Sequence, residues 1–309
     1  MEKRKMILDC DTGHDDAVAL MLAGSNENID LVGVTVVAGN MRLERTLPNT
    51  LFVCQHTGID VDVYGGMTLP LIRDQVTAPE IHGVSGLDGA RFENITKQPG
   101  DKHAVQYLID TLMASDGDIT LVPVAPLTNI AMAIRMEPRI VDKIKEIVLM
   151  GGSVGLGNTT ASAEFNIYAD PEAAYIVFTS GIKITMMGLD ITRTAIATEE
   201  VIQRIEKIGN NASRLFADIL RVAYEKQKDN GMGGVPVHDV CAVCYLIAPQ
   251  IYTTKDMYVQ VDINHGPCYG RTICDYYGQS GKPANVTVGL AVDLDKFWDI
   301  VAQSIAKLK

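Results

Sequence analysis

Short apolar runs alternate with helix-like segments over the first two thirds of the chain. The runs that predict strands are residues 5–8, 31–39, 61–66, 119–124, 146–152 and 183–190. Apolar residues recur with helical spacing at 16–25, 103–117, 126–136 and 170–181. Continuously apolar strands that alternate with helices are typical of a parallel sheet covered on both faces. The pattern therefore predicts an α/β fold with an open, mostly parallel, Rossmann-like sheet.

The pattern changes after residue 197. Residues 198–228 read as helical, with a break predicted at the Asn210–Asn211 pair, and the Gly-rich residues 228–236 predict a mobile loop. There follow a predicted helix at 238–249, β-like runs at 257–264, 270–277 and 284–293, and an amphipathic helix at 295–308. We interpret this part as a small β-rich and helical insertion near the C-terminus. Because the sequence contains no low-complexity linker or internal repeat, we predict a single domain over residues 1–309.

The overall charge limits the classes of partner. The formal net charge of −11 argues against nucleic acid and anionic membranes, because both require a basic surface. The six Cys lie in apolar runs of a long chain, which predicts free thiols in a reducing compartment. No signal peptide is evident, and no apolar run approaches the roughly 18 residues of a membrane span. These features predict a cytoplasmic protein, and they are compatible with a small neutral or cationic ligand.

Four aspartates fall within ILDCDTGHDD at residues 7–16. Asp9 and Asp11 end the first predicted strand, and Asp15 and Asp16 begin the next predicted helix, at the sheet edge where α/β folds bind ligands. The helix dipole favours acidic residues in its first turn by only about 0.3–1 kcal/mol each, so a capped helix does not account for all four. A divalent cation would neutralise them, and oxygen ligands favour Ca²⁺ or Mg²⁺ over Zn²⁺.

Two other classes of carboxylate site begin in a similar way. An EF-hand starting at Asp9 fails, because Gly falls at loop position five and Leu20 stands at position twelve, where Glu is needed. A haloacid-dehalogenase-like Mg²⁺ phosphohydrolase also begins with a hydrophobic residue and Asp-x-Asp, which residues 8–11 match. The neighbouring Asp15–Asp16 pair is foreign to that class and its later motifs are not evident, but it remains an alternative.

The aspartate segment resembles the Asp-x-Asp-x-Gly-x-Asp-Asp signature of the inosine-uridine-preferring nucleoside hydrolases. Further segments match that family in the same chain order. They are VVAGN, ending at Asn40; IHGVSGLDG, with His82; VPVAPLTNIA, with Val124; residues 150–174, with Asn158, Glu164 and Asn166; and PVHD, with His238 and Asp239. Within the family, the chain looks most similar to bacterial pyrimidine-preferring ribonucleoside hydrolases.

The resemblance implies a Ca²⁺-dependent enzyme. Its expected reaction is hydrolysis of the N-glycosidic bond of ribonucleosides, giving ribose and free base in nucleoside salvage. Uridine and cytidine are the expected substrates, and inosine is a further candidate. One Ca²⁺ per subunit would be held by Asp11, Asp16, Asp239 and the backbone carbonyl of Val124, with Asp11 also acting as general base. The resemblance also implies a homo-oligomer, either a tetramer or a dimer.

The resemblance assigns further roles in substrate binding. The residues expected to hold the ribose are Asp15, Asn40, Asn158, Glu164 and Asn166. His238 and His82 are the candidates for protonating the leaving base, because histidine donates a proton near neutral pH. Gln227 lies in a glycine-rich segment, residues 223–234, that is expected to close over the base. Its side-chain amide is a candidate for hydrogen bonding to an edge of the base.

Two features bear on base preference and loop rigidity. Purine-specific relatives tend to stack the base on Trp, whereas the only Trp here, Trp298, lies on an apparently packed face of the last helix. Thr12 stands where the family usually has Pro, so the aspartate loop lacks the fixed φ of a proline. A non-catalytic nucleoside-binding protein remains a further alternative, and the preferred base stays open at this point.

Overall fold

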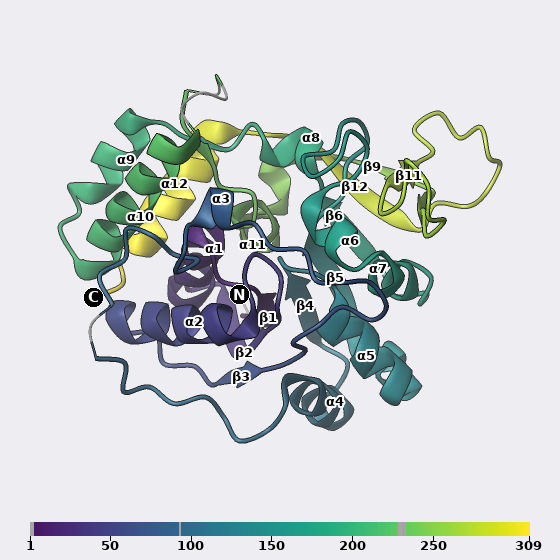
Figure 1. Ribbon diagram of the computed structural model, residues 1–309, viewed down its shortest axis with the longest axis horizontal. Helices are drawn as coiled ribbons and strands as arrows, with labels where there is room; N and C mark the ends of the chain where they lie inside the picture. Colours follow the sequence, from purple (N-terminus) through teal and green to yellow (C-terminus); the bar gives the residue numbers. More distant parts are fainter. Residues whose placement is uncertain (1–2, 93, 228–230, 232) are drawn as a thin grey trace.

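The computed structural model describes residues 3–92, 94–227, 231 and 233–309. Its centre is an eight-stranded sheet with the order β3-β2-β1-β4-β5-β6-β12-β9 (Figure 1). All neighbouring strands run parallel except β9, which pairs antiparallel with β12. The strands are β1 (Arg4–Cys10), β2 (Ile29–Val36), β3 (Val63–Gly65), β4 (Ile119–Pro123), β5 (Ile144–Met150), β6 (Ile184–Met187), β9 (Tyr252–Met257) and β12 (Val286–Val292).

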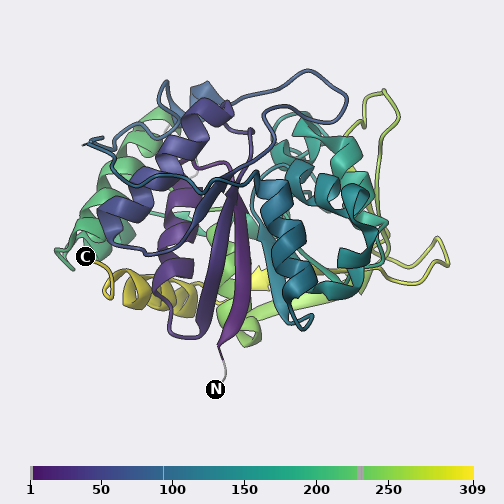
Figure 2. The same ribbon diagram turned by 90° about the horizontal axis from the view of Figure 1, so that it is seen from below.

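Helices cover both faces of this sheet, as the view along its edge shows (Figure 2). One face packs against α1 (His14–Ser25), α2 (Leu43–Thr57) and α11 (Val240–Ile247). Over these helices lie α9 (Glu199–Glu206), α10 (Asn211–Gln227) and α12 (Leu294–Ile305), which belong to the same core. The other packs against α4 (Ala104–Ala114), α5 (Thr128–Met136) and α7 (Pro171–Phe178). In β1, Met6 and Leu8 enter the first core and Ile7 the second, which explains why these three consecutive positions are all apolar. The predicted fold class is confirmed.

The C-terminal part differs in detail from the predicted insertion. The strands β9 and β12 complete the main sheet, and only β10 (Val259–Val261) and β11 (Thr272–Cys274) form a separate antiparallel pair. A second small pair joins β7 (Ile196–Ala197) to β8 (Val235–Pro236). The predicted helical break is present between α9 and α10, where Asn210 Oδ1 accepts a hydrogen bond from Ser213 N at 2.8 Å. Four residues of the predicted mobile loop, 228–230 and 232, lie outside the described residues.

The strand order places a ligand crevice at the centre of the sheet. From β1 the chain builds outward through β2 and β3 on one side, and through β4, β5 and β6 on the other. In such sheets the crevice lies outside the carboxyl ends of the strands at the point where the order reverses, here between β1 and β4. The connections that leave these ends include residues 11–13 after β1, 124–127 after β4 and 151–164 after β5.

Candidate active site

A cavity of about 370 Å³ lies at this edge of the sheet, within the range of about 300–1,000 Å³ that is usual for small-molecule sites. Two of the predicted site residues, Asp11 and Asp16, are not in its lining and are fully buried. The others all line it: Asp15, Asn40, His82, Val124, Asn158, Glu164, Asn166, Gln227, His238 and Asp239. The structure therefore brings together residues that are spread over most of the chain.

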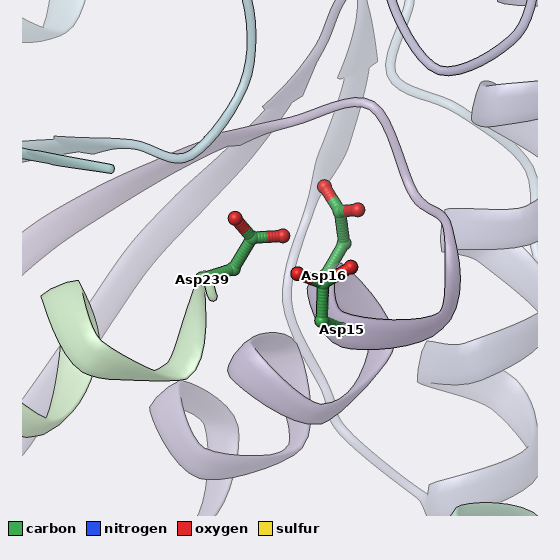
Figure 3. Close-up of side chains that lie close together, drawn as sticks. All are labelled: Asp15, Asp16 and Asp239. Carbon is green, nitrogen blue, oxygen red and sulfur yellow. The ribbon is translucent and has the colours of Figure 1, made fainter. Parts of the chain in front are cut away.

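Three carboxylates meet where two helices begin. Asp15 and Asp16 lie in the first turn of α1, and Asp239 precedes the first residue of α11. One oxygen of each lies within 4.8 Å of one oxygen of the other two. Figure 3 shows their side chains close together, two from α1 and one from α11. Packed carboxylates of this kind need a positive charge nearby or must retain protons.

Asp11 is oriented differently from the other predicted metal ligands. Its Oδ2 accepts a hydrogen bond from Asn40 N, and its own N–H donates to Asp16 Oδ1 at 3.0 Å. Its Oδ1 is buried and has no hydrogen-bond partner among the described residues. Asp11 is therefore adjacent to Asp16, although the cluster of three contains Asp15, which was predicted to contact the ribose, and not Asp11. An orphaned buried carboxylate oxygen beside further carboxylates is a feature that a hard cation would satisfy.

Burial and mutual repulsion raise the pKa of the clustered carboxyl groups. For Asp11 the pKa lies well above its usual value because of burial and then the charge of Asp16. For Asp239 burial also comes first and the charge of Asp15 second. Burial and Asp16 raise the pKa of Asp15 to about 6. The pKa of Asp16 is raised by burial, although the N–H of Gly13 and that of Asp11 oppose this by donating to the carboxylate.

A wall of carboxylate and amide groups follows the ends of β4 and β5. Glu164 caps the short helix α6 (Phe165–Ala169) by accepting from the N–H groups of Asn166 and Ile167, and it accepts from Gly152 N at 2.9 Å. Burial raises the pKa of Glu164 to about 7. Asn166 Nδ2 donates to Val124 O at 3.0 Å and to the carbonyl at the end of β5. These bonds fix the side chains that face the cavity.

The two remaining amides are also fixed by hydrogen bonds. Asn158 Oδ1 accepts from Phe165 N at 2.9 Å, which ties the 151–164 loop to the start of α6. Asn40 Nδ2 donates to Asp16 Oδ2 at 3.2 Å. Asn40 is therefore part of the carboxylate site and not only a turn residue after β2.

Both predicted histidines line the cavity and are held through Nδ1. His82 Nδ1 accepts from the backbone N–H of His14 at 3.3 Å, and the two rings stack with centroids 5.3 Å apart. Burial lowers the pKa of His82 well below its usual value. His238 Nδ1 lies 2.7 Å from Thr192 Oγ1, and burial lowers its pKa while the charge of Asp15 opposes this. Gly13 is required beside His82, because a Cβ there would lie 2.3 Å from its Nδ1.

Several residues of the site were not predicted from the sequence. His14 is buried and supports His82, and the Nε2 of His14 lies 2.9 Å from the carbonyl oxygen of Asp88. Arg193 lines the cavity and Thr192 contacts His238, and neither belongs to a motif that marks it. Phe165 also lines the cavity, and it lies in the matched segment 150–174 without having been singled out. Gln227 ends α10 at the cavity, and the predicted closing segment continues into residues outside the described chain.

Among the described residues, no helix combines the length and the apolar character needed to cross a bilayer.

Comparison with known sequences identifies close relatives over the whole length. The chain is 57% identical over 306 residues to proteins named pyrimidine-specific ribonucleoside hydrolase RihB from Escherichia coli strain SE11 and from Escherichia fergusonii. Each alignment covers 99% of this chain and 98% of the relative.

Solved structures of nucleoside hydrolases also superpose closely on this chain. A purine-preferring ribonucleoside hydrolase from Gardnerella vaginalis superposes with a TM-score of 0.91 at 32% identity, covering 98% of both chains. The plant nucleoside hydrolase PpNRh1 superposes with a TM-score of 0.91 at 26% identity, covering 98% of this chain and 99% of that one. The family model for the inosine-uridine preferring nucleoside hydrolases matches residues 6–299. The chain thus belongs to the inosine-uridine preferring nucleoside hydrolase family, as its motifs predicted, and is a hydrolase of N-glycosyl bonds.

Proposed function

We propose that this protein hydrolyses pyrimidine ribonucleosides to ribose and free base, with uridine and cytidine as the expected substrates and inosine as a third candidate. One observation carries the proposal. A single cavity of about 370 Å³ combines clustered carboxylates, a wall of amide and carboxylate groups, and two histidines. These are the groups needed to activate water, to hold a polyhydroxylated sugar and to assist a leaving base.

Two observations support a pyrimidine base. The relatives that are 57% identical are named pyrimidine-specific, whereas the purine-preferring structure is 32% identical. The single Trp of the chain, Trp298, packs edge-on against Phe297 in α12 and is not among the residues that line the cavity. The cavity therefore has no Trp on which a purine could stack.

The carboxylate cluster fits a hard divalent cation, for which we propose one Ca²⁺ per subunit. Asp11, Asp16, Asp239 and the carbonyl oxygen of Val124 would hold it. The fit rests on a donor set made only of oxygens and on Asp11 Oδ1, which is buried and has no partner among the described residues. When bound, the cation would lower the pKa of a water molecule and orient it.

Asp11 is the proposed general base. The hydrogen bond from Asn40 N to Oδ2 fixes the carboxylate plane, and Oδ1 has no hydrogen-bond partner among the described residues. The carboxylate that would contact the ion would also take the proton of the attacking water while the water adds to the anomeric carbon. A general base of this kind contributes about 10²–10⁴-fold to the rate.

The ribose is the part of the substrate that develops positive charge in an oxocarbenium-like transition state. The proposed sugar ligands are Asp15, Asn40, Asn158, Glu164 and Asn166. Because hydrogen bonds to neighbouring groups fix the carboxylate of Glu164 and the amides of the three Asn, they need little reorganisation when the sugar binds. A site that bonds the sugar hydroxyls also discriminates against deoxyribose, because its buried polar groups would lose their partners.

The base leaves with a pair of electrons and needs a proton or a hydrogen-bond donor. We propose His238 for this role, with His82 as a second donor and Gln227 reading an edge of the base. All three line the same cavity. Burial lowers the pKa of His238, and the charge of the neighbouring Asp15 opposes this by favouring the protonated ring.

The alternative of a haloacid-dehalogenase-like phosphohydrolase requires a reactive carboxylate at Asp9 or Asp11. Asp9 Oδ1 accepts from Thr35 Oγ1 at 2.6 Å and from Asn129 Nδ2 at 2.8 Å, and Asp9 is not in the cavity lining. This orientation favours a structural role for Asp9. The other alternative, a non-catalytic nucleoside-binding protein, would bind the nucleoside in the same cavity as the proposed hydrolase but would not release the base.

Incubation with a panel of nucleosides tests the proposal directly. Reducing sugar and free base should appear from uridine and cytidine, should vanish in the presence of a strong Ca²⁺ chelator, and should return when excess Ca²⁺ is added. Deoxyuridine should react poorly. Phosphate release from a phosphomonoester with Mg²⁺ would support the phosphohydrolase alternative, and binding of uridine without any base release would support the binding protein.

Three further expectations stay predictions. They are the homo-oligomer, tetramer or dimer; the cytoplasmic location; and the role in nucleoside salvage. The prediction of one domain over residues 1–309 is supported by the family match across residues 6–299.

A further inference from the structure

The short helix α8 (Leu189–Thr192) ends directly beside the cavity, and its last residue contacts a proposed catalytic group. Thr192 is fully buried, and its Oγ1 lies 2.7 Å from His238 Nδ1. In the part of the chain that the structure describes, this hydroxyl has no other hydrogen-bond partner. The contact links β6, from which α8 follows, to the turn that carries Asp239.

The direction of this hydrogen bond follows from the environment of the hydroxyl. A buried hydroxyl hydrogen needs an acceptor, and the acceptor within reach of Thr192 is His238 Nδ1. A neutral imidazole has one nitrogen that donates and one that accepts. If Nδ1 accepts from Thr192, the ring proton resides on Nε2, the nitrogen left available to a ligand in the cavity.

His82 shows the same arrangement with a different partner. Its Nδ1 accepts from the backbone N–H of His14, which also leaves its proton on Nε2. The tautomer of His82 is set by a backbone N–H, which a substitution does not remove. The tautomer of His238 is set by the hydroxyl of Thr192, which a substitution can remove. The cavity thus presents two imidazole N–H donors, a combination that suits a leaving base with carbonyl or ring-nitrogen acceptors.

We propose that Thr192 is a positioning residue that holds His238 as the Nε2–H tautomer facing the leaving base. The inference rests on the proposed function, because it assumes that His238 assists base departure. Thr192 itself touches neither the sugar nor the base. Its hydroxyl sets which nitrogen of His238 carries the proton and in which direction the ring points.

The test compares three variants at Thr192 and a neighbouring site, with uridine and with 4-nitrophenyl riboside as substrates. In Thr192→Val, kcat for uridine should fall by about 10–100-fold, with KM changed by less than about 3-fold. The loss should be smaller than the roughly 10²–10³-fold that removal of a preorganised hydrogen-bond donor costs, because the Nε2–H donor to the departing base is misplaced and not removed. Nitrophenolate leaves without a proton, so that substrate should lose less than about 3-fold. Thr192→Ser keeps the hydroxyl and should restore turnover of uridine.

Thr194→Val is the matched control. Thr194 is exposed, and its hydroxyl donates to Ile191 O at 2.7 Å without contacting His238, so turnover of both substrates should be unchanged. In the double variant Thr192→Val, His238→Ala, the loss on uridine should equal that of His238→Ala alone, because both changes remove one function. Equal losses on both substrates, or additive losses in the double variant, would overturn the inference.

A spectroscopic measurement keeps the inference testable if Thr192→Val folds poorly. Nitrogen-15 spectra of the histidine rings in the wild-type protein should assign the proton of His238 to Nε2. A proton on Nδ1 would contradict the proposal. Failure of the proposed function gives a different result: wild-type protein would release no base from uridine, or His238→Ala would slow both substrates equally.

Discussion

The two oxygens of the Asp11 carboxylate lie in different surroundings. Oδ2 accepts from Asn40 N, whereas Oδ1 is buried and lacks a partner among the described residues. Burial and the charge of Asp16 raise the pKa of Asp11 well above its usual value. Without a bound cation, the ionised carboxylate of Asp11 therefore lowers the stability of the folded state. Destabilising groups of this kind are typical of positions where catalysis needs a proton acceptor.

Asp11→Asn separates the charge of this group from its shape. For uridine, kcat should fall by at least about 10²-fold, because the amide cannot accept a proton. In the presence of a chelator the melting temperature should stay constant or rise, since one buried like charge is removed. Steady-state kinetics and thermal unfolding measure the two effects. Asp118→Asn, at an exposed ion pair with Lys5, is the control and should keep wild-type activity. If Asp11→Asn keeps activity within tenfold of wild type, the general-base role is excluded.

Single residues differ in how well the sequence predicts them. The aspartates were predictable because they lie within one short segment after a strand. Thr192 was not, because its partner His238 is 46 residues away and no spacing marks the pair. Thr12, in place of the usual Pro, donates or accepts a hydrogen bond with Thr50 Oγ1 at 2.7 Å, so side-chain bonding to α2 anchors the loop. Such contacts depend on packing between distant elements and leave no local pattern.

At the scale of elements, the 151–164 loop depends on supports from two directions. Asp190 of α8 accepts from Val154 N and Gly155 N. Thr272 of β11 accepts from Ser153 N at 2.8 Å and donates to Ser153 O at 2.7 Å. The small β10–β11 pair thus contributes to the site by holding the loop that carries Asn158.

Thr272→Val should loosen this loop. Thr272 is buried, so the variant leaves both backbone groups of Ser153 without that partner and should lower the free energy of unfolding by about 1–3 kcal/mol. KM for uridine should rise as Asn158 becomes less well placed. Chemical denaturation and steady-state kinetics measure the two effects. The same substitution at Thr287, whose hydroxyl bonds the exposed Asp256, should change stability by about 0.5 kcal/mol or less. Identical effects at the two positions would contradict the bracing role.

Element prediction succeeded where one face of a segment is apolar. The strands from β1 to β6 and the break between α9 and α10 were predicted, but α2 was not. That helix contains Pro48, and the polar residues Thr46, Asn49 and Thr50 are buried among its apolar ones, which interrupts the apolar pattern. The strand β9 was missed as well, because its sequence YTTKDM is mostly polar and forms the edge of the sheet.

At the scale of the whole molecule, buried carboxyl groups link stability to pH. Burial raises the pKa of Asp9 and of Glu164 to about 7, and it raises the pKa of Asp11 and of Asp239 well above the usual value. The folded state therefore binds more protons than the unfolded chain at neutral pH, so stability falls as pH rises through these values. The lowered pKa values of His14, His82 and His238 act in the opposite direction as pH falls through their unfolded value of 6.5. Their contribution declines as pH rises above 6.5, so the carboxyl groups dominate toward pH 8.

Thermal unfolding between pH 6.5 and 8 tests this linkage. In the presence of a chelator, the melting temperature should fall as pH rises across this range, because the buried carboxyl groups must give up protons. With excess Ca²⁺ the fall should be smaller, and the stabilisation by Ca²⁺ should be larger at pH 8 than at pH 6.5, since the ion competes with protons. Mg²⁺ at equal concentration is the comparison. A stabilisation by Ca²⁺ that is independent of pH would contradict the proposed ligand set.

The meeting of α1 and α11 at the carboxylates has a consequence for local opening of the fold. Asp16 and Asp239 are more than 200 residues apart in the chain, yet both belong to helix starts that meet at one point. An ion held by both would tether the first helix to the penultimate helix, much as a covalent cross-link would. Stripping it should therefore speed amide exchange in α1 and α11 together, while α4 and α5, on the opposite face, keep their rates. Mass spectrometry of deuterium uptake with and without Ca²⁺ would show whether these two distant segments respond as one unit.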